Sequence, residues 1–291
     1  MKNNKQILVT GGAGFVGTNL IKLLLKKTSY KVVSIDNYTS GTKLNHIRSS
    51  RVKYIKGNTA NISKLVKNPD KIKTIFHFGE FARIYQSFLK MDQCIESNSI
   101  GTNAIFNFCL KHKVKLIYSA TSASLGNKGN DRNLSPYAFT KAKNLELLEN
   151  LKKWFNFKYE VIYFYNVYGP HQICRGQMST VIGIFEDHYK RKEPLPVVLP
   201  GTQTRRFTHI SDTVEICYLA WKKNLCRHYS IASKKSYSVL EVAKIFKSKI
   251  KFLPRRQGER YASALTKINL SNKIYKHFGK IELKDYIHNL I

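Results

Sequence analysis

Short apolar runs alternate with longer amphipathic stretches along the chain as far as residue 165. The runs are five to seven residues long and rich in Val, Ile, Leu, Tyr and Phe, which is typical of buried strands. The stretches between them repeat apolar residues at helical spacing. This alternation predicts an α/β fold, a doubly wound parallel sheet with helices on both faces. Strands are predicted at Gln6–Thr10, Lys31–Ile35, Thr74–Phe78, Lys115–Ser119 and Tyr159–Tyr165, and helices at about Phe15–Lys26, 92–112 and 138–156.

A glycine-rich turn separates the first predicted strand from the first predicted helix. Gly11 permits a tight turn, Gly14 lets backbone N–H groups approach a ligand, and Gly17 lets the helix pack close to the sheet. The helix N-terminus would then present its partial positive charge to a pyrophosphate. Asp36 ends the second strand about 20 residues further on, where a carboxylate binds both ribose hydroxyls and repels a 2′-phosphate. A turn that only caps a helix would explain the glycines but not Asp36, so the pattern predicts a Rossmann-type site for NAD rather than NADP.

Tyr137 and Lys141 lie four residues apart in a stretch that reads as helical, so both side chains project from one helix face. A phenol with a pKa of about 10 is a poor base at neutral pH, and an adjacent ammonium lowers that pKa. The spacing alone arises often by chance in a chain with 17 Tyr. Behind a dinucleotide turn and a Ser/Thr-rich strand end at 119–126, it predicts Tyr137 as the catalytic acid and base. Lys141 is predicted to set its pKa and to hold the nicotinamide ribose.

Further short segments follow in a fixed order. They read TGGAGFVG at 10–17, DNYTSG at 36–41, FHFG at 76–79, NSIGT at 98–102, SPYAFTK at 135–141, NVYGP at 166–170, QTR at 203–205 and RQGE at 256–259. As a set they resemble the NAD-dependent epimerase/dehydratase family of extended short-chain dehydrogenases, in particular its UDP-glucose and UDP-N-acetylglucosamine 4-epimerases. The resemblance implies a Rossmann domain at residues 1–170 and a smaller substrate-binding lobe at 171–291, interleaved with it.

The resemblance also assigns site residues. It implies that Thr121 bonds the reacting sugar hydroxyl and that Asn166, Arg205 and Arg256 bind the nucleotide sugar. Ser263 takes a position where a small residue admits an N-acetyl group at the sugar C2, although an incidental serine is an alternative. The positions similar to the family's cofactor contacts are Gly11, Gly14, Phe15, Val16, Gly17, Asp36, Asn37, Asn58, Phe78, Gly79, Asn98, Tyr137 and Lys141.

The two arginines suit a diphosphate because a guanidinium fork binds phosphate oxygens well. Arg206 and Arg255 stand beside them, so a shift of one residue stays open.

The residues after Thr121 bear on the type of reaction. Relatives that dehydrate or decarboxylate a nucleotide sugar have an acidic residue one or two positions after this Thr, whereas this chain has Ser122 and Ala123, neither of which serves as a carboxylic acid. The sequence therefore favours oxidation at C4, rotation of the 4-keto sugar and return of the hydride, which regenerates NAD. The alternatives are another enzyme on the same scaffold, such as a reductase or a different epimerase, or a non-catalytic NAD-binding protein.

Several positions depart from the family pattern. Asn58 replaces the usual acid that meets the adenine amino group, and Glu80 and Arg83 are unusual charges beside the expected pyrophosphate site. Tyr163 stands where an Arg is common, and Leu125 where a Tyr is common. These changes do not alter the predicted fold, but they affect which sugar the site is expected to accept.

The net charge of the chain does not alter the predicted function. The 291 residues include 50 Lys and Arg and 18 Asp and Glu, a net charge of +32. The lysines are scattered through nearly every segment, without an arginine-rich block or a nucleic-acid motif. A solvated surface, whose field also attracts anionic nucleotide sugars, accounts for this distribution, so no nucleic-acid partner is expected.

Cysteines and hydropathy set the remaining expectations. The five cysteines form no CxxC pair, so neither a disulfide framework nor a metal site is predicted and a cytoplasmic location fits best. No apolar run approaches the roughly 20 residues of a membrane span. By resemblance, a homodimer is expected, packed through the helices near 92–112 and 138–156.

Overall fold

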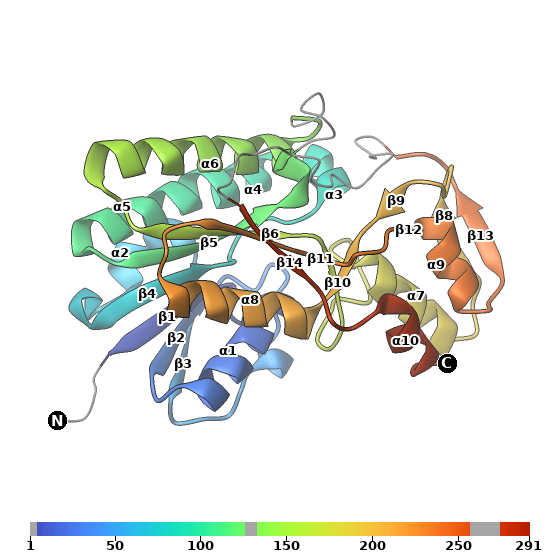
Figure 1. Cartoon of the computed structure of the whole chain (residues 1–291), viewed down its shortest axis with the longest axis horizontal. Helices are drawn as coiled ribbons and strands as arrows, with labels where there is room; N and C mark the ends of the chain where they lie inside the picture. The colour runs from blue at the N-terminus through green and yellow to red at the C-terminus, as the bar shows by residue number, and fades with distance from the viewer. Residues whose placement is uncertain (1–4, 126–132, 257–273) are drawn as a thin grey trace.

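The apolar runs pair side by side in one parallel sheet that crosses the molecule (Figure 1). The computed structural model describes residues 5–125, 133–256 and 274–291. Within these residues the large sheet has the strand order β14–β11–β6–β5–β4–β1–β2–β3, and all neighbours are parallel. The strands are β1 (Gln6–Thr10), β2 (Lys31–Asp36), β3 (Val52–Lys56), β4 (Ile72–His77), β5 (Lys115–Thr121), β6 (Tyr159–Phe164), β11 (His228–Ala232) and β14 (Ile274–Phe278).

The doubly wound parallel sheet predicted from the sequence is confirmed. Strands β1, β2, β5 and β6 begin at the predicted residues, and β4 begins two residues earlier than predicted. The ends of all five strands lie within two residues of the predicted ends. The strand order reverses between β1 and β4, and this reversal opens a crevice at the carboxyl ends of the central strands. Strands β3, β11 and β14 were not predicted.

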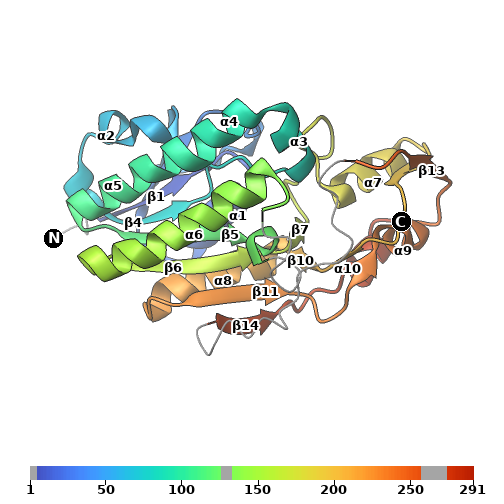
Figure 2. The ribbon, with the colours of Figure 1, turned by 90° about the horizontal axis from the view of Figure 1, so that it is seen from above.

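Helices cover both faces of the sheet, as Figures 1 and 2 show. On one face α1 and α8 pack on β1, β2 and β4, and on the other α2, α5 and α6 pack on the opposite side chains of the same strands. Leu20, Ile21 and Leu24 of α1 are fully buried, and each such side chain contributes about 2 kcal/mol. The helices of this part are α1 (Phe15–Lys27), α2 (Ile62–Leu65), α3 (Ile84–Leu89), α4 (Met91–Ile95), α5 (Thr102–His112), α6 (Pro136–Phe155) and α8 (Ile210–Lys223), with short 3-10 turns η1 (Lys43–Asn45), η2 (Thr59–Asn61), η3 (Pro69–Lys71) and η5 (Ser122–Leu125).

The helical stretch predicted at 92–112 is interrupted by a π-helical segment, η4 (Glu96–Gly101), between α4 and α5. In this wider turn Asn98 and Gly101 face inward and are buried. A Cβ on Gly101 would lie 2.3 Å from Thr59 Oγ1, so only glycine allows this approach to η2. The periodicity of the sequence indicates a helix here but not the wider turn.

A smaller group of elements lies at one end of the sheet (Figure 1) and has its own apolar core, which includes Phe185, Val197 and Phe246. After residue 170 the chain also returns to the large sheet, where it adds the strands β11 and β14, and α8 packs on the sheet. The elements of this end are β7 (Asn166–Tyr168) paired with β10 (Phe207–His209), β8 (Leu195–Val198) with β13 (Ile250–Leu253), β9 (Thr204–Arg205) with β12 (Tyr237–Ser238), and the helices α7 (Val181–Lys190), α9 (Val239–Ile245) and α10 (Leu283–His288).

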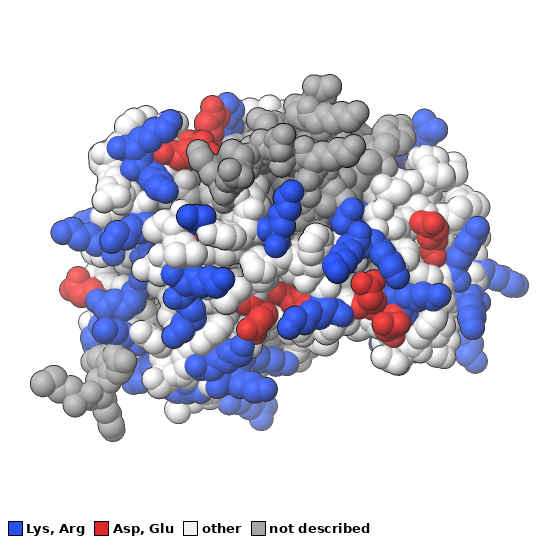
Figure 3. Space-filling view, in the orientation of Figure 1, with Lys and Arg blue, Asp and Glu red and all other residues white. Residues whose placement is uncertain are grey.

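Lys and Arg side chains are spread over the face seen in Figure 3, with Asp and Glu among them. On this face the positive charge forms no single block, as the scatter of lysines along the sequence indicates. No helix in the part of the chain that the structure describes is long and apolar enough to cross a membrane.

The packing of α1 against the glycine turn generates a stability prediction. A Cβ on Gly17 would lie 2.2 Å from the Gly11 carbonyl oxygen and 2.6 Å from Gly12 Cα, so Gly17→Ala forces backbone atoms apart. We expect this variant to lose about 1–3 kcal/mol of unfolding free energy in urea denaturation. Lys26→Ala, on the exposed side of the same helix, is the control and should stay within about 0.5 kcal/mol of the wild type. A Gly17→Ala protein as stable as the wild type would contradict the packing argument.

Candidate active site

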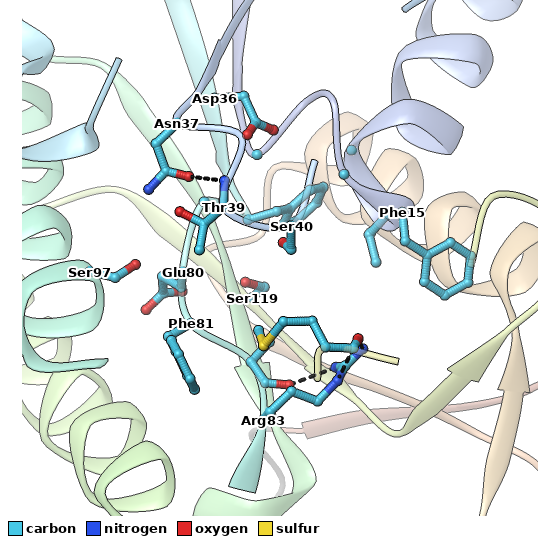
Figure 4. Close-up of a pocket in the computed structure, with 18 of the residues that line it drawn as sticks. Phe15, Asp36, Asn37, Thr39, Ser40, Glu80, Phe81, Arg83, Ser97 and Ser119 are labelled. Atoms are coloured by element: carbon cyan, nitrogen blue, oxygen red, sulfur yellow. Dashed lines mark hydrogen bonds between the residues drawn. The ribbon is translucent and has the colours of Figure 1, made fainter. Parts of the chain in front are cut away.

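A cavity of about 450 Å³ opens beside the N-terminus of α1, at the carboxyl ends of β1, β2 and β4 (Figure 4). It lies at the reversal of strand order, where open parallel sheets bind their ligands. With the exception of Asn98, all the residues predicted to bind the cofactor line this cavity. They are Gly11, Gly14, Phe15, Val16, Gly17, Asp36, Asn37, Asn58, Phe78, Gly79, Tyr137 and Lys141.

The glycine turn gives the cavity a floor of backbone. Gly11 has a φ of +69°, and a Cβ there would lie 2.9 Å from Gly79 N, so the turn packs directly on the loop after β4. Gly14 is the N-cap of α1 and provides no side-chain hydrogen bond to the helix. The first N–H groups of the helix have no intrahelical partner and are left for a ligand. This arrangement fits a pyrophosphate.

Asp36 stands at the end of β2 with its carboxylate turned toward the turn. Its two oxygens accept hydrogen bonds from Ala13 N at 2.9 Å and Tyr38 N at 2.8 Å. Burial raises the pKa of Asp36, and these backbone hydrogen bonds oppose the shift. A carboxylate has about four lone-pair positions, so acceptors remain for ribose hydroxyls. The site therefore fits a dinucleotide without a 2′-phosphate.

Two predicted cofactor contacts have other partners in the structure. Asn58 lines the cavity, but its Oδ1 caps η2 by accepting from Ala60 N at 3.0 Å, and its Nδ2 donates to Glu96 at 2.9 Å. Asn98 is completely buried and lines neither this cavity nor the substrate cavity described below. Its amide accepts from Phe81 N at 2.6 Å and donates to Phe81 O at 3.0 Å, so Asn98 fixes the loop that borders the cavity.

The three predicted catalytic residues come from adjacent elements. Thr121 ends β5, and Tyr137 and Lys141 lie on the first two turns of α6, which Ser135 caps by accepting from Ala138 N at 3.1 Å. The Thr121 side chain hydrogen-bonds to the Tyr137 phenol. The structure thus brings together a hydroxyl, a phenol and an ammonium that lie 20 residues apart in sequence.

Burial raises the pKa of Tyr137 to about 12. The hydrogen bond from Thr121 opposes this shift, the Glu80 carboxylate adds to it, and the nearby Arg83 guanidinium also opposes it. The sequence predicted that Lys141 would lower this pKa. The structure instead gives Lys141 an ion pair with Glu80, and the cation near the phenol is Arg83.

A second cavity, also of about 450 Å³, adjoins the first on the side of the C-terminal elements. Predicted substrate residues Asn166, Arg205 and Arg256 line it, together with Thr121 and Tyr137. The two cavities share a common wall, formed by Phe15, Val16, Ala82, Arg83, Tyr137 and Phe164. A ligand in either cavity therefore contacts the Tyr137 region.

The charges of the second cavity are all positive among the lining residues that the structure describes: Arg83, Arg205 and Arg256 are present, and no Asp or Glu is. Ser122 and Ala123 also line it, so neither of the two positions after Thr121 provides an acid. Of the neighbouring arginines, Arg206 donates to the carbonyls of Ser233 and Lys234 at 2.7 and 2.8 Å and does not line the cavity. Ser263 lies outside the described residues.

Sequence reasoning assigned no role to several residues of this site. In the sequence, Glu80 and Arg83 stand out only as unusual charges. Ser119 and Ser87 were not singled out for their contacts, although the Ser119 carbonyl accepts from Lys141 at 2.5 Å and Ser87 Oγ accepts from Tyr137 N at 3.2 Å. The charges of Glu80 and Arg83, in a segment rich in Phe, are the available signal.

Comparisons with known proteins point to one family. The profile of the NAD dependent epimerase/dehydratase family matches residues 7–232. An ADP-L-glycero-D-manno-heptose-6-epimerase of Brachyspira hyodysenteriae is 28% identical, with 83% of this chain and 80% of that protein covered. An uncharacterized UDP-glucose epimerase of Bacillus subtilis is 28% identical, with 98% and 96% covered.

A UDP-glucose 4-epimerase of Thermotoga maritima, solved with UDP-glucose, superimposes with a TM-score of 0.84. It is 24% identical, and the superposition covers 97% of this chain and 96% of that one. At this level of sequence identity, the similarity shows that the two chains share a fold.

The position of Asp36 leads to a cofactor prediction. We expect Asp36→Ala to weaken NADH binding about tenfold or more, because the acceptor for the ribose hydroxyls is lost, while NADPH binding weakens less or improves. Fluorescence titration with both nucleotides measures the ratio of their dissociation constants. Lys31→Ala, at the exposed start of the same strand, should leave both constants unchanged. An equal loss for NADH and NADPH would mean that Asp36 only supports the turn.

Proposed function

This chain belongs to the NAD dependent epimerase/dehydratase family, with NAD as its cofactor, and on that premise we propose that it is a nucleotide-sugar epimerase acting at C4 of a UDP-hexose or UDP-N-acetylhexosamine. One observation carries the proposal. Tyr137 and its hydrogen-bond partner Thr121 stand where the dinucleotide cavity meets a second cavity that is lined by arginines and, in its described part, by no carboxylate.

The roles of the residues follow from their positions. Bound NAD supplies a reversible hydride acceptor at the sugar carbon. Tyr137 takes up and returns the proton of the C4 hydroxyl. Thr121 forms hydrogen bonds with both that hydroxyl and the phenol. Lys141, which lines the cofactor cavity, holds the nicotinamide ribose. The raised pKa keeps the phenol protonated at neutral pH in the free chain. The groups that stabilise the phenolate therefore set how readily Tyr137 acts as a base.

The arginines of the second cavity would bind the substrate diphosphate. Arg205 lies on β9, and Arg256 follows β13 with its guanidinium 5.4 Å from the centre of the Tyr85 ring. The two approach the cavity from separate segments, and Asn166 on β7 adds an amide. A diphosphate held between two guanidinium forks would keep the nucleotide fixed while the smaller 4-keto sugar rotates to present its other face.

The lining of the second cavity also weighs against the alternatives. A dehydratase needs a carboxylic acid beside the new ketone, and Ser122 and Ala123 occupy those positions. A reductase that uses NADP would meet the buried carboxylate of Asp36. A non-catalytic NAD-binding protein has no chemical reason to keep Thr121 bonded to Tyr137.

The activity is tested by incubating the purified protein, without added cofactor, with UDP-GlcNAc and with UDP-Glc while the anomeric protons are followed by NMR. We expect the C4 epimer to appear, and faster turnover of the N-acetyl sugar would support the reading of Ser263. Tyr137→Phe should lower the rate at least about 1000-fold because the proton acceptor is gone. Tyr159→Phe, also a buried tyrosine but in the core, should stay close to the wild type. If neither sugar changes even with NAD added, the UDP-hexose proposal fails.

We further propose a homodimer packed through the helices α3, α4 and α6 with the π segment between α4 and α5. Large apolar side chains stay exposed there: Leu89 (61%), Met91 (54%), Ile100 (57%) and Phe139 (44%). We also propose that the chain divides near residue 170 into a Rossmann domain and a substrate-binding lobe, and that the protein is cytoplasmic, which suits its five free cysteines.

Sedimentation tests the assembly. We expect the mass of two chains, and we expect Ile100→Asp to shift it toward one chain because a charge would be buried in the interface. Leu44→Asp, which replaces a leucine that is 92% exposed elsewhere, should leave the mass unchanged. A wild-type mass equal to one chain would rule out the dimer.

A further inference from the structure

A buried carboxylate lies directly behind the proposed catalytic residues. The side chain of Glu80, on the loop after β4, is 2% exposed. Its Oε2 forms an ion pair with Lys141. Its Oε1 accepts hydrogen bonds from Thr102 Oγ1 at 3.0 Å, Tyr118 OH at 3.1 Å and Asn144 Nδ2 at 3.5 Å. Four donors from β5, α5 and α6 therefore converge on one carboxylate, which is held in a single position.

These contacts fix Lys141. Of the three N–H groups of its ammonium, one donates to Glu80 and one to the Ser119 carbonyl at 2.5 Å. The ammonium also lies 4.8 Å from the centre of the Tyr118 ring. Lys141 lines the cofactor cavity, so one donor is left for a ribose hydroxyl. The positive charge, however, is neutralised by its partner.

Arg83 donates its hydrogen bonds to backbone carbonyls, whereas Lys141 also donates to a carboxylate. It is half-buried and lines both cavities, as Tyr137 does. Its guanidinium donates to Met178 O at 3.0 and 2.5 Å and to Ala82 O at 2.7 Å, all neutral acceptors (Figure 4). Within the described ranges no carboxylate forms an ion pair with Arg83. Its charge is therefore available to the Tyr137 phenol.

We propose that Glu80 is a positioning residue that fixes and neutralises Lys141, so that Arg83, rather than Lys141, is the cation that stabilises the Tyr137 phenolate. Lys141 is then left with the ribose. The assignment rests on the proposed function, because it concerns the proton transfer that Tyr137 performs there.

The other titratable groups around Glu80 are uncharged at neutral pH. Burial lowers the pKa of His77 to about 4, and burial raises the pKa of Cys94 to about 11. Burial also raises the pKa of Tyr118, and Glu80 adds to that shift. Of the charged side chains, Glu80 and Arg83 therefore act on Tyr137, while Lys141 is paired with Glu80. Glu80 raises the pKa of Tyr137 and Arg83 lowers it, which predicts opposite effects of removing them.

The test compares the pH dependence of kcat for four variants on whichever nucleotide sugar the wild type converts. A base must be deprotonated to act, so a lower pKa moves the acid limb of the profile to lower pH. Glu80→Gln should move this limb down by about one pH unit, and Arg83→Met should move it up by about one unit. The charge-retaining controls Glu80→Asp and Arg83→Lys should keep the limb near that of the wild type.

Other outcomes decide against the proposal. If Glu80→Gln lowers kcat equally at every pH, Glu80 is only structural. If Arg83→Met leaves the limb in place, Arg83 does not stabilise the phenolate. Should Glu80→Gln fail to fold, the Arg83 pair of variants carries the test, because Arg83 is on a partly exposed loop.

A substrate-free measurement separates this proposal from the proposed function. If the wild type converts no nucleotide sugar, the epimerase function fails, and Tyr137 is then titrated in the NAD-bound protein by tyrosinate absorbance. Subtraction of the matching Tyr137→Phe spectrum isolates its signal. Titration of Tyr137 at lower pH in Glu80→Gln than in the wild type supports the proposal, and identical titrations overturn it.

Discussion

The buried contact between Glu80 and Lys141 joins the parts of the molecule that the site needs. From Glu80 a line of hydrogen bonds runs through Thr102 and His77 to Thr10, at the end of β1. Because the Thr102 hydroxyl hydrogen goes to Glu80, Thr102 accepts from His77 Nε2 at 3.0 Å, and Nδ1 accepts from Thr10 at 2.7 Å. Thr10 Oγ1 in turn accepts from Phe78 N and Gly79 N at 3.1 and 3.0 Å. The glycine turn and the proposed catalytic lysine therefore belong to one polar network.

Such a network is stable only when all its members are present. Removing one partner of a buried ion pair costs about 3–5 kcal/mol, because the other charge stays buried without compensation. Here Glu80, Lys141, Thr102, Tyr118 and Asn144 satisfy one another, and burial keeps His77 neutral by lowering its pKa to about 4. The arrangement holds the loop after β4 in place beside both cavities, and that loop carries Arg83.

The C-terminal elements reach the same loop from the other side. Met178, whose carbonyl binds Arg83, lies in a segment that Gln172 and Thr180 anchor. Gln172 donates to Glu186 on α7 at 2.6 Å, and Tyr286 on α10 donates to the same carboxylate at 2.9 Å. The position of the smaller group of elements is thus linked to Arg83, at the wall that the two cavities share. A ligand in the arginine-lined cavity and one in the glycine-floored cavity meet there.

The sequence by itself determined five strands of the parallel sheet, the glycine turn, Asp36 and the placing of Tyr137 and Lys141 on one helix. These depend on periodicity, on the conformational freedom of glycine and on helical spacing, which act over fewer than about 25 residues. Family resemblance added Thr121, Asn166, Arg205 and Arg256, and each lines the second cavity. The buried place of Asn98, the π segment and the strands β11 and β14 were decided by tertiary packing. So was the division of charge among Glu80, Lys141 and Arg83: Glu80 and Lys141 are 61 residues apart, and only folding puts them in contact where low solvent access makes their pairing strong.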